Sequence, residues 1–460
     1  MSLKLSSYLI VPKTHIDSKK NYLVYSTRSG NSLVINEKTL SNLQKSIFTN
    51  IPEELKRKLI ENKILVDSNE NEFESIINVF KNAKKIDTTL SLVIAPSANC
   101  QLGCDYCGQI HSKTNMNIDL ERNIINHITK KLNCKEYKDI EIVWYGGEPL
   151  LSIKSIERLT DKIKSICDAN KINYTSSMIT NGLNLNSRNF ENLVLKMNIK
   201  SFQITVDGTK NTHDNSRHTK ELKPTFDIIF NNIIKAAKSS IYLSENVHIS
   251  IRVNVHKNNV NEIDDLIDFL YSKEIHNKVD LYFAAVHDWG NNKADEKIGL
   301  SQNEFAEREI DWLIKMNDLG FKKSTILPPA ITGTCMTTSD DSELIDATGK
   351  VSYCWEVPYT DEFIKDTSLT IGNLNEAKEM TYNKSFPLRD WFNDIKSGTN
   401  NSSNCKNCIF LPNCGGACPI SWYKGNPACP SFKFNIEDRL IMEYLSVTEN
   451  QPIEAFVENN

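Results

Sequence analysis

This chain of 460 residues contains twelve cysteines, and their thiolates are its clearest candidates for metal binding. Cys100, Cys104 and Cys107 have the spacing C-x3-C-x2-C and directly follow an apolar, strand-like run. Three thiolates on one short loop can bind three irons of a 4Fe–4S cube and leave the fourth iron open to a small chelating ligand. Two alternatives stay open at this point: a zinc site with His111 as its fourth ligand, and isolated structural cysteines.

Seven more cysteines lie in the C-terminal part of the chain. A zinc ribbon also uses C-x2-C pairs, but seven thiolates do not divide into sites of four. Disulfides are disfavoured because the chain does not start with a secretion signal. The other two cysteines, Cys134 and Cys167, fit no pattern and are expected to be structural. The seven are Cys335, Cys354, Cys405, Cys408, Cys414, Cys418 and Cys429.

Six apolar runs must position the first cysteine group. They alternate with amphipathic helical stretches between residues 88 and 320, as 153–170 and 259–272 illustrate. This alternation predicts a parallel sheet curled into a partial barrel, with the chemistry at the C-terminal ends of its strands. The runs are 89–95, 140–145, 174–180, 202–206, 247–255 and 279–286.

Polar motifs stand where several of these runs end. The second run leads into Trp144-Tyr-Gly-Gly-Glu-Pro149, and the third ends at Thr180-Asn-Gly182. Glycines permit close approach of a ligand to the backbone, and the Glu148 carboxylate can bind an ammonium group. The fourth run precedes a segment from Val206 to Arg217. Plain strand-to-helix turns are the alternative interpretation of these motifs.

The cysteine triplet after the first strand, followed by a GGEP motif, resembles the radical S-adenosylmethionine (SAM) superfamily. The resemblance implies that Cys100, Cys104 and Cys107 hold a 4Fe–4S cluster that binds SAM. Arg217 would contact the SAM carboxylate. Asp207 and His213 are candidates for the catalytic residue that accepts a proton. The residues implied to contact SAM are Tyr106, Gly146, Gly147, Glu148, Pro149, Thr180, Asn181, Arg217 and Asn254.

The C-terminal cysteines resemble the SPASM extension of radical SAM enzymes, which carries two auxiliary iron–sulfur clusters. The resemblance implies three clusters in all, with auxiliary clusters of the 4Fe–4S type. Some members have an eighth cysteine close to the first, and neither side of Cys335 offers one here. The first auxiliary cluster therefore has an open iron, a non-cysteine ligand or a different type. Its implied ligands are Cys335, Cys354 and Cys418, and those of the second are Cys405, Cys408, Cys414 and Cys429.

Residues 1–85 predict a small separate module. A strand–turn–strand signal covers 21–35 with its turn at 29–31, and helical stretches cover 37–44 and 52–62. This arrangement fits a winged-helix-like module and resembles the leader-peptide recognition domains of peptide maturases. Such domains bind a leader as an added strand, here near residues 23–35. A cap that stabilises the barrel is the alternative.

The fold class expected is α/β: a partial (β/α)6 radical SAM barrel with an N-terminal winged-helix-like peptide-recognition module and a C-terminal cysteine-rich SPASM domain. The expected boundaries are 1–85 for the recognition module, 88–320 for the barrel, 325–432 for the SPASM domain, and 433–460 for a closing helix and tail.

The resemblance implies a peptide maturase. A 5′-deoxyadenosyl radical would remove a hydrogen atom from a residue of a ribosomal precursor peptide, and a C–C, C–S or C–O crosslink would form. The implied partners are the precursor peptide with its leader and an external electron donor such as flavodoxin or ferredoxin. An anaerobic sulfatase-maturating type of residue oxidase and a non-enzymatic iron–sulfur or zinc scaffold are the alternatives.

Composition limits the other possibilities. A net charge of −4 predicts no nucleic-acid surface. The sequence contains no apolar run long enough to span a membrane, and its start does not predict a secretion signal. A cytoplasmic location is therefore expected.

Overall fold

The largest element of the fold is a nine-stranded sheet. The computed structural model describes residues 2–289, 292–322, 325–376 and 388–450, except 14, 16, 18 and 19. Parts of the expected barrel (290–291), SPASM domain (377–387) and tail (451–460) lie outside these residues. All six predicted runs are strands and pair in parallel, in the order β11-β10-β9-β8-β7-β6. The predicted partial barrel is thus confirmed. The strands are β6 (Thr89–Ile94), β7 (Asp139–Trp144), β8 (Asn173–Thr180), β9 (Ile199–Thr205), β10 (His248–Val255) and β11 (Asp280–Ala285).

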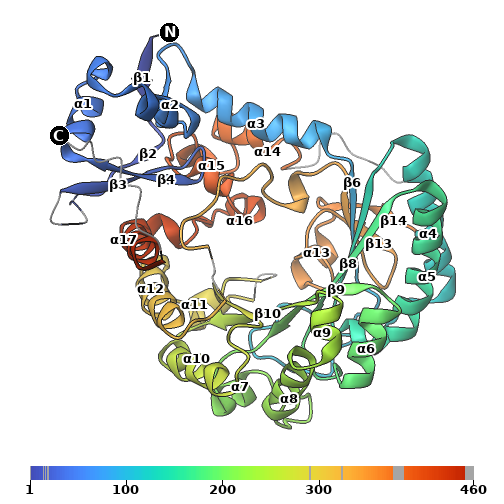
Figure 1. Cartoon of the computed structure of the whole chain (residues 1–460). Helices are drawn as coiled ribbons and strands as arrows, with labels where there is room; N and C mark the ends of the chain where they lie inside the picture. Colours follow the sequence, from blue (N-terminus) through green and yellow to red (C-terminus); the bar gives the residue numbers. More distant parts are fainter. Residues whose placement is uncertain are drawn as a thin grey trace.

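Helices cover the outer face of this curved sheet (Figure 1). The clearest example is α5 (Ile153–Asn170), where Ile156, Leu159, Ile163 and Cys167 are all buried. Their spacing places them on one face of the helix, which packs on the sheet. The prediction that Cys167 belongs to the core is therefore confirmed. The other covering helices are α4 (Ile118–Cys134), α6 (Ser187–Leu195), α7 (Lys210–Ser216), α8 (Phe226–Ala237), α9 (Ser240–Ser244) and α10 (Ile263–Ser272).

Three short strands from the cysteine-rich region extend the same sheet. β12 (Ser342–Ile345) lies parallel to β6, while β13 (Lys350–Ser352) and β14 (Thr370–Asn373) continue antiparallel. The sequence predicted no strands here, since short segments among polar residues show no clear alternation. The sheet consequently runs across the expected boundary between 320 and 325.

The N-terminal module has its own small core. β2 (Leu9–Ile10), β3 (Asn21–Ser26) and β4 (Asn31–Asn36) form an antiparallel sheet with β4 at one edge. Gly30, with φ +72°, lies in the predicted turn between β3 and β4. The helices α1 (Glu37–Gln44) and α2 (Glu53–Glu61) pack on this sheet, and β1 (Leu3–Leu5) pairs with β5 (Leu65–Asp67).

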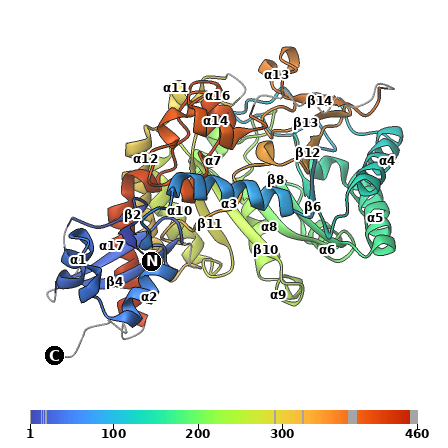
Figure 2. The same cartoon turned by 90° about the horizontal axis from the view of Figure 1, so that it is seen from above.

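Two long helices join the module to the rest of the chain. α3 (Glu72–Ile86) runs from the module to β6, and α17 (Phe432–Asn450) packs beside β3 (Figure 2). Leu23 and Tyr25 of β3 share an apolar cluster with Phe410, Ile436 and Leu440 from the C-terminal region. The module therefore contacts the cysteine-rich region through a buried surface.

The remaining elements are short, apart from the helix α12 (Gln302–Asp318). No described helix is long and apolar enough to cross a membrane. These elements are η1 (Phe48–Asn50), η2 (Pro149–Ser152), η3 (Val260–Glu262), α11 (Ala294–Ile298), α12 (Gln302–Asp318), η4 (Met336–Thr338), α13 (Asp361–Lys365), α14 (Trp391–Ser397), η5 (Ser402–Cys405), α15 (Leu411–Cys414) and α16 (Pro419–Tyr423).

Candidate active site

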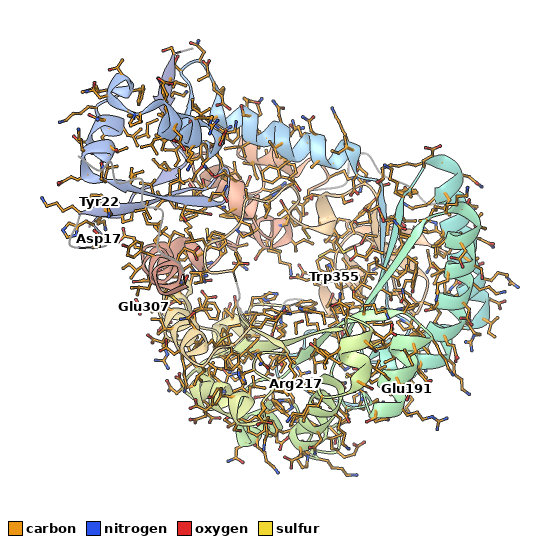
Figure 3. The ribbon with its side chains drawn as sticks, in the orientation of Figure 1. Asp17, Tyr22, Glu191, Arg217, Glu307 and Trp355 are labelled. Atoms are coloured by element: carbon orange, nitrogen blue, oxygen red, sulfur yellow. The ribbon has the colours of Figure 1, made fainter. Side chains whose placement is uncertain are left out.

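A cavity of about 480 Å³ lies at the C-terminal ends of the barrel strands. Its size is in the range of small-molecule sites. Figure 3 labels Arg217 and Trp355, two of its lining residues, which come from the barrel and from the cysteine-rich region. The predicted residues that line it are Cys100, Cys104, Cys107, Tyr106, Gly146, Gly147, Thr180, Asn181, Arg217 and Asn254. The structure thus brings together most of the predicted site.

Backbone hydrogen bonds fix the cysteine loop (residues 100–107) from two directions. The Gly103 N–H donates to the His218 carbonyl at 2.9 Å, on the segment that follows α7. Just beyond the loop, the Ile110 N–H donates to the Tyr359 carbonyl at 2.5 Å, in the cysteine-rich region. Backbone hydrogen bonds to both the barrel and the C-terminal region therefore hold the cysteine loop and the residues that follow it.

The arrangement of the three thiols fits a cluster better than a single ion. Among the described residues, no three His, Cys, Asp or Glu side chains converge as the ligands of one metal ion would. In a 4Fe–4S cube each thiolate binds a different iron, so the sulfurs surround a space. Cys100, Cys104 and Cys107 all line the cavity, as such a cluster would require. His111 also lines it, with Nε2 3.9 Å from the Cys107 sulfur.

The Glu148 carboxylate joins two strand ends. It accepts hydrogen bonds from the Thr180 hydroxyl at 2.7 Å, the Asn181 N–H at 2.8 Å and the Leu150 N–H at 3.0 Å. Burial raises the pKa of Glu148, although these donors oppose the shift. Glu148 and Pro149 are buried and are not among the lining residues. A contact between Glu148 and a SAM ammonium therefore remains a prediction, while its role in joining β7 to β8 is visible.

Tyr106 is the centre of a polar network on the other side of the cavity. Its hydroxyl donates to Asp207 and accepts from Arg217 at 2.6 Å and from Asn254 at 3.1 Å. Burial raises the pKa of Tyr106 well above its ordinary value, and the Asp207 carboxylate adds to the rise. The network joins the cysteine loop to the ends of β9 and β10.

Unsatisfied polar atoms indicate that this cavity suits a polar ligand. Arg217, which lines the cavity, has a buried Nε without a hydrogen-bond partner in the structure. A buried guanidinium nitrogen without a partner is costly unless an acceptor binds it. A Cβ atom on Gly147 would lie 2.5 Å from the Asn99 carbonyl oxygen, so this residue has no room for a side chain. These features fit SAM, whose carboxylate is an acceptor for Arg217.

The two predicted proton acceptors, Asp207 and His213, are not among the residues that line the cavity. Both ring nitrogens of His213 have partners: the Asp207 N–H at 3.3 Å and the Thr225 hydroxyl at 3.2 Å. Burial lowers the pKa of His213 to about 3, and the Arg217 charge contributes. Asp207 is fully buried and is engaged with Tyr106 and the Asn254 N–H. This placement gives neither residue access to a substrate in the cavity, so it supports a structural role for both.

A second cavity, of about 220 Å³, contains four cysteines of the C-terminal group. The Lys433 ammonium donates to the Cys429 sulfur at 3.3 Å. The four are Cys405, Cys408, Cys414 and Cys429, the same set that the resemblance to the SPASM extension implied for one cluster.

Cys335, Cys354 and Cys418 form a third group. Burial raises the pKa of Cys354 well above its ordinary value, and the nearby charges of Glu356, Cys335 and Cys418 add to this. Cys354 also accepts a hydrogen bond from the Glu356 N–H at 3.4 Å. Cys335, Cys354 and Cys418 thus lie near one another and outside the four-cysteine cavity, while their role as cluster ligands stays a prediction.

Several lining residues were not predicted from the sequence. Tyr145 and Trp355 pack edge to face with ring centroids 5.0 Å apart, and Trp289 lies beside His287. His287 follows β11 by two residues, so its place after a barrel strand was the available signal. Trp355 directly follows the predicted ligand Cys354, but its position depends on how the C-terminal region folds over the barrel.

Residues 94–270 match the model of the Radical SAM superfamily. Together with the six parallel strands and the cysteine loop, this match identifies a radical SAM domain in the chain. The cofactors of this class are SAM and a 4Fe–4S cluster.

Two relatives and one solved structure extend the comparison. The chain is 26% identical over 353 residues to a cysteine-type anaerobic sulfatase-maturating enzyme of Clostridium novyi (strain NT), covering 72% of this chain and 88% of the relative. It is 26% identical over 474 residues to the radical SAM cyclopropyl synthase TigE of Paramaledivibacter caminithermalis (strain DSM 15212 / CIP 107654 / DViRD3), covering 90% of this chain and 89% of the relative. The structure of native anSMEcpe with bound AdoMet (SAM) superposes with a TM-score of 0.54 and 18% identity, covering 78% of this chain and 99% of that chain. This likeness shows the shared fold.

Proposed function

We propose that this chain is a radical SAM peptide maturase with two auxiliary iron–sulfur clusters that oxidatively installs a crosslink in a ribosomal precursor peptide. The observation that carries the proposal is the free edge of β4 in a module that packs on the cysteine-rich region. An edge strand offers unpaired backbone groups to an extended peptide. The following paragraphs give the support for each part.

The cavity residues support the assignment of the SAM site. Cys100, Cys104 and Cys107 would hold the cluster, and Arg217 would bind the SAM carboxylate through its unpartnered nitrogen. Bound SAM and a reduced cluster supply a carbon-centred radical that abstracts a hydrogen atom. The protein itself orients the ligand through Asn181, Asn254 and the Gly147 backbone, and it covers the cavity with Trp355.

The two groups of C-terminal cysteines support auxiliary clusters. Cys405, Cys408, Cys414 and Cys429 surround one cavity and would supply four thiolates. Cys335, Cys354 and Cys418 would supply three, which leaves one position for another ligand. Clusters at these places would accept the electron that an oxidised substrate gives up. The reducing electron for SAM would come from a flavodoxin or ferredoxin.

The relative that spans most of the chain favours a particular bond. A cyclopropyl synthase is named for a ring of three carbons, and the likeness to it covers 90% of this chain. Among the C–C, C–S and C–O crosslinks, this favours a C–C bond. A residue oxidase of the sulfatase-maturating type is the second candidate, favoured by the likeness that covers 72% of the chain.

A proline scan of β4 tests the leader site. Proline removes one N–H, and successive strand residues direct their N–H groups alternately to β3 and to the free edge. Ser32, Leu33 and Val34 are replaced one at a time. The probe is the leader of the precursor encoded beside this gene, and its affinity is measured by fluorescence anisotropy. Alternation is expected: substitutions at the free edge weaken leader binding, while those facing β3 lower the unfolding temperature. Unchanged affinity in every folded variant would reject the leader site.

Reconstitution tests the chemistry. Anaerobically prepared protein should contain about 12 irons, from three cubes of four. Cys405→Ala should lose about four of them, and Cys134→Ala, outside all three groups, should lose none. Under strong reductant the complete enzyme should release 5′-deoxyadenosine and lower the mass of the precursor by about 2 Da, the mass of two hydrogen atoms. The same loss of mass without a crosslink between two residues, or a converted cysteine in a sulfatase-type peptide alone, would favour the second candidate.

A further inference from the structure

The proposed oxidation needs a group that accepts a proton from the substrate, and the cavity offers few. Among its described lining residues there is no Asp, Glu or Lys, and the two histidines are His111 and His287. His111 lies 3.9 Å from the sulfur of Cys107, at the cluster end of the cavity. His287 lies after β11 and beside Trp289. By position, His287 is the lining imidazole that is separate from the cluster ligands.

A buried carboxylate lies behind His287. The distance from His287 Nε2 to Glu356 Oε1 is 3.6 Å. The His287 side chain is 48% exposed, while that of Glu356 is 10% exposed. The imidazole therefore faces the cavity with one nitrogen directed to the carboxylate and the other available to a substrate. A carboxylate in this position orients an imidazole and stabilises its protonated form.

Lys424 holds this carboxylate in place. Its ammonium lies 3.2 Å from Glu356 Oε2 and 2.7 Å from Glu362 on α13. Glu356 thus binds His287 with one oxygen and Lys424 with the other. The pairing connects the end of β11 to α13 and to the residue that follows α16. None of these contacts involves the network around Tyr106.

We propose that His287 is the catalytic residue that accepts the proton from the substrate, with Glu356 as its positioning residue; this rests on the proposed function. The substrate loses a hydrogen atom from one carbon, and this atom passes to the 5′-deoxyadenosyl radical, which becomes 5′-deoxyadenosine. It then loses a proton to His287 and one electron to an oxidised iron–sulfur centre of the cysteine-rich region. The new bond joins the carbon that lost the hydrogen atom to the atom that lost the proton. The substrate thus loses one hydrogen atom, one proton and one electron, which together are equivalent to two hydrogen atoms.

The location of His287 supports separate acceptors for the proton and for the electron. It lies at the rim that the barrel shares with Trp355, and Trp355 follows Cys354 directly in the chain. A substrate between His287 and Trp355 would therefore have the SAM-binding residues on one side and the three-cysteine group on the other. Proton and electron acceptors would then flank the same substrate atoms.

Three variants of the full-length, cluster-loaded enzyme test the proposal. His287→Gln and His287→Ala remove the base, and His248→Gln is the matched control, because His248 pairs with Asp280 at the start of β10 and does not line the cavity. Each is given the precursor peptide carrying deuterium at its carbons. Product, 5′-deoxyadenosine and its deuterium content are measured together with iron content and unfolding temperature.

The expected result separates hydrogen transfer from product formation. His287→Gln and His287→Ala should still place deuterium in 5′-deoxyadenosine but form product about 100-fold more slowly. Imidazole added to His287→Ala should restore part of the product rate, as a general-base role requires. Glu356→Gln should lower the product rate, and Glu356→Asp, which keeps the charge, should recover part of it. His248→Gln should behave as the wild type.

Other outcomes overturn the inference. These are wild-type product rates in both His287 variants, no response to imidazole, or loss of iron and folding in both variants, since the last would make the role structural. Failure of the proposed function is a different result. In that case the unaltered enzyme itself would leave the precursor mass unchanged.

Discussion

Asn413 Nδ2 lies 2.8 Å from the hydroxyl of Tyr25, so a residue of the cysteine-rich region donates to the centre of the N-terminal sheet. The same amide also lies 3.0 Å from the Pro328 carbonyl, which accepts from the Tyr25 hydroxyl as well. These groups are buried, and Asn413 directly precedes Cys414. The contact couples the N-terminal module to a proposed cluster ligand.

Asn413→Ala should destabilise this junction. The change leaves buried carbonyl groups without their donor, which costs about 1–3 kcal/mol. Thermal or denaturant unfolding of the cluster-loaded protein measures the loss. Asn393→Ala, on the exposed side of α14, should stay within about 0.5 kcal/mol of the wild type. Equal stability of both variants would show that the junction does not depend on Asn413.

Gly147→Ala should weaken SAM binding without unfolding the barrel. Its Cβ would meet the Asn99 carbonyl oxygen at 2.5 Å and displace the backbone beside the cysteine loop. Isothermal titration with SAM should show an affinity at least about tenfold lower, equal to about 1.4 kcal/mol. Gly103→Ala is the control within the loop, because its Cβ would have 3.6 Å to the nearest atom. Similar affinities for the two variants would contradict the close approach at Gly147.

Lys433→Met should make the proposed cluster in the four-cysteine cavity harder to reduce. The Lys433 ammonium donates to the Cys429 sulfur at 3.3 Å, and hydrogen bonds to cluster sulfurs raise the reduction potential. A redox titration followed by electron paramagnetic resonance should therefore show a more negative potential. Lys406→Met serves as the control, since that ammonium lies over the Phe73 ring. A shift of the same size in both variants would point to general charge and not to the hydrogen bond.

The free energy of unfolding should fall at acid pH because the Glu343 carboxylate becomes protonated. This fully buried carboxylate pairs with His127 at 2.7 Å and with Lys131. Burial raises its pKa, but the His127 hydrogen bond and the Lys131 charge outweigh burial and bring the pKa below 4.5. The carboxylate is therefore protonated more readily in the unfolded chain. Its contribution to stability is complete above pH 4.5 and is lost as the pH falls through the lower, folded-state value.

Unfolding measured between pH 3 and 6 checks this dependence, with the pH range set by the ordinary carboxyl value of about 4.3. Glu343→Gln should be less stable than the wild type at pH 6, and the difference should shrink as the pH falls. Glu136→Gln, which alters an exposed carboxyl, should retain the wild-type slope. A constant difference for Glu343→Gln at all pH values would contradict the assignment.

Much of the barrel was readable from the sequence because its strands are buried and apolar. Each of the six predicted runs overlaps its strand, and the stretch 153–170 coincides with α5 (Ile153–Asn170). The division of the C-terminal cysteines came from their resemblance to the SPASM extension. Cys405, Cys408, Cys414 and Cys429 line one cavity, and Cys335, Cys354 and Cys418 lie near one another outside it.

What the sequence did not reveal depends on contacts between distant segments. His287 and Glu356 meet only because the cysteine-rich region folds over the end of β11. Glu148 has the expected position after β7, but its carboxylate is taken up by Thr180 and Asn181. His213 was a reasonable candidate as a histidine after a barrel strand, and only the burial of its ring shows that it faces the protein.

The pairing of β12 with β6 has a consequence for how the protein is made. β6 is synthesised early, but the strand that completes its open edge ends at Ile345, about three quarters of the way along the chain. During translation the growing barrel would therefore expose an unpaired strand, and such edges recruit other chains. Truncation before β12 should yield aggregates rather than a working barrel, because the open edge of β6 is covered only after the chain has been made past Ile345.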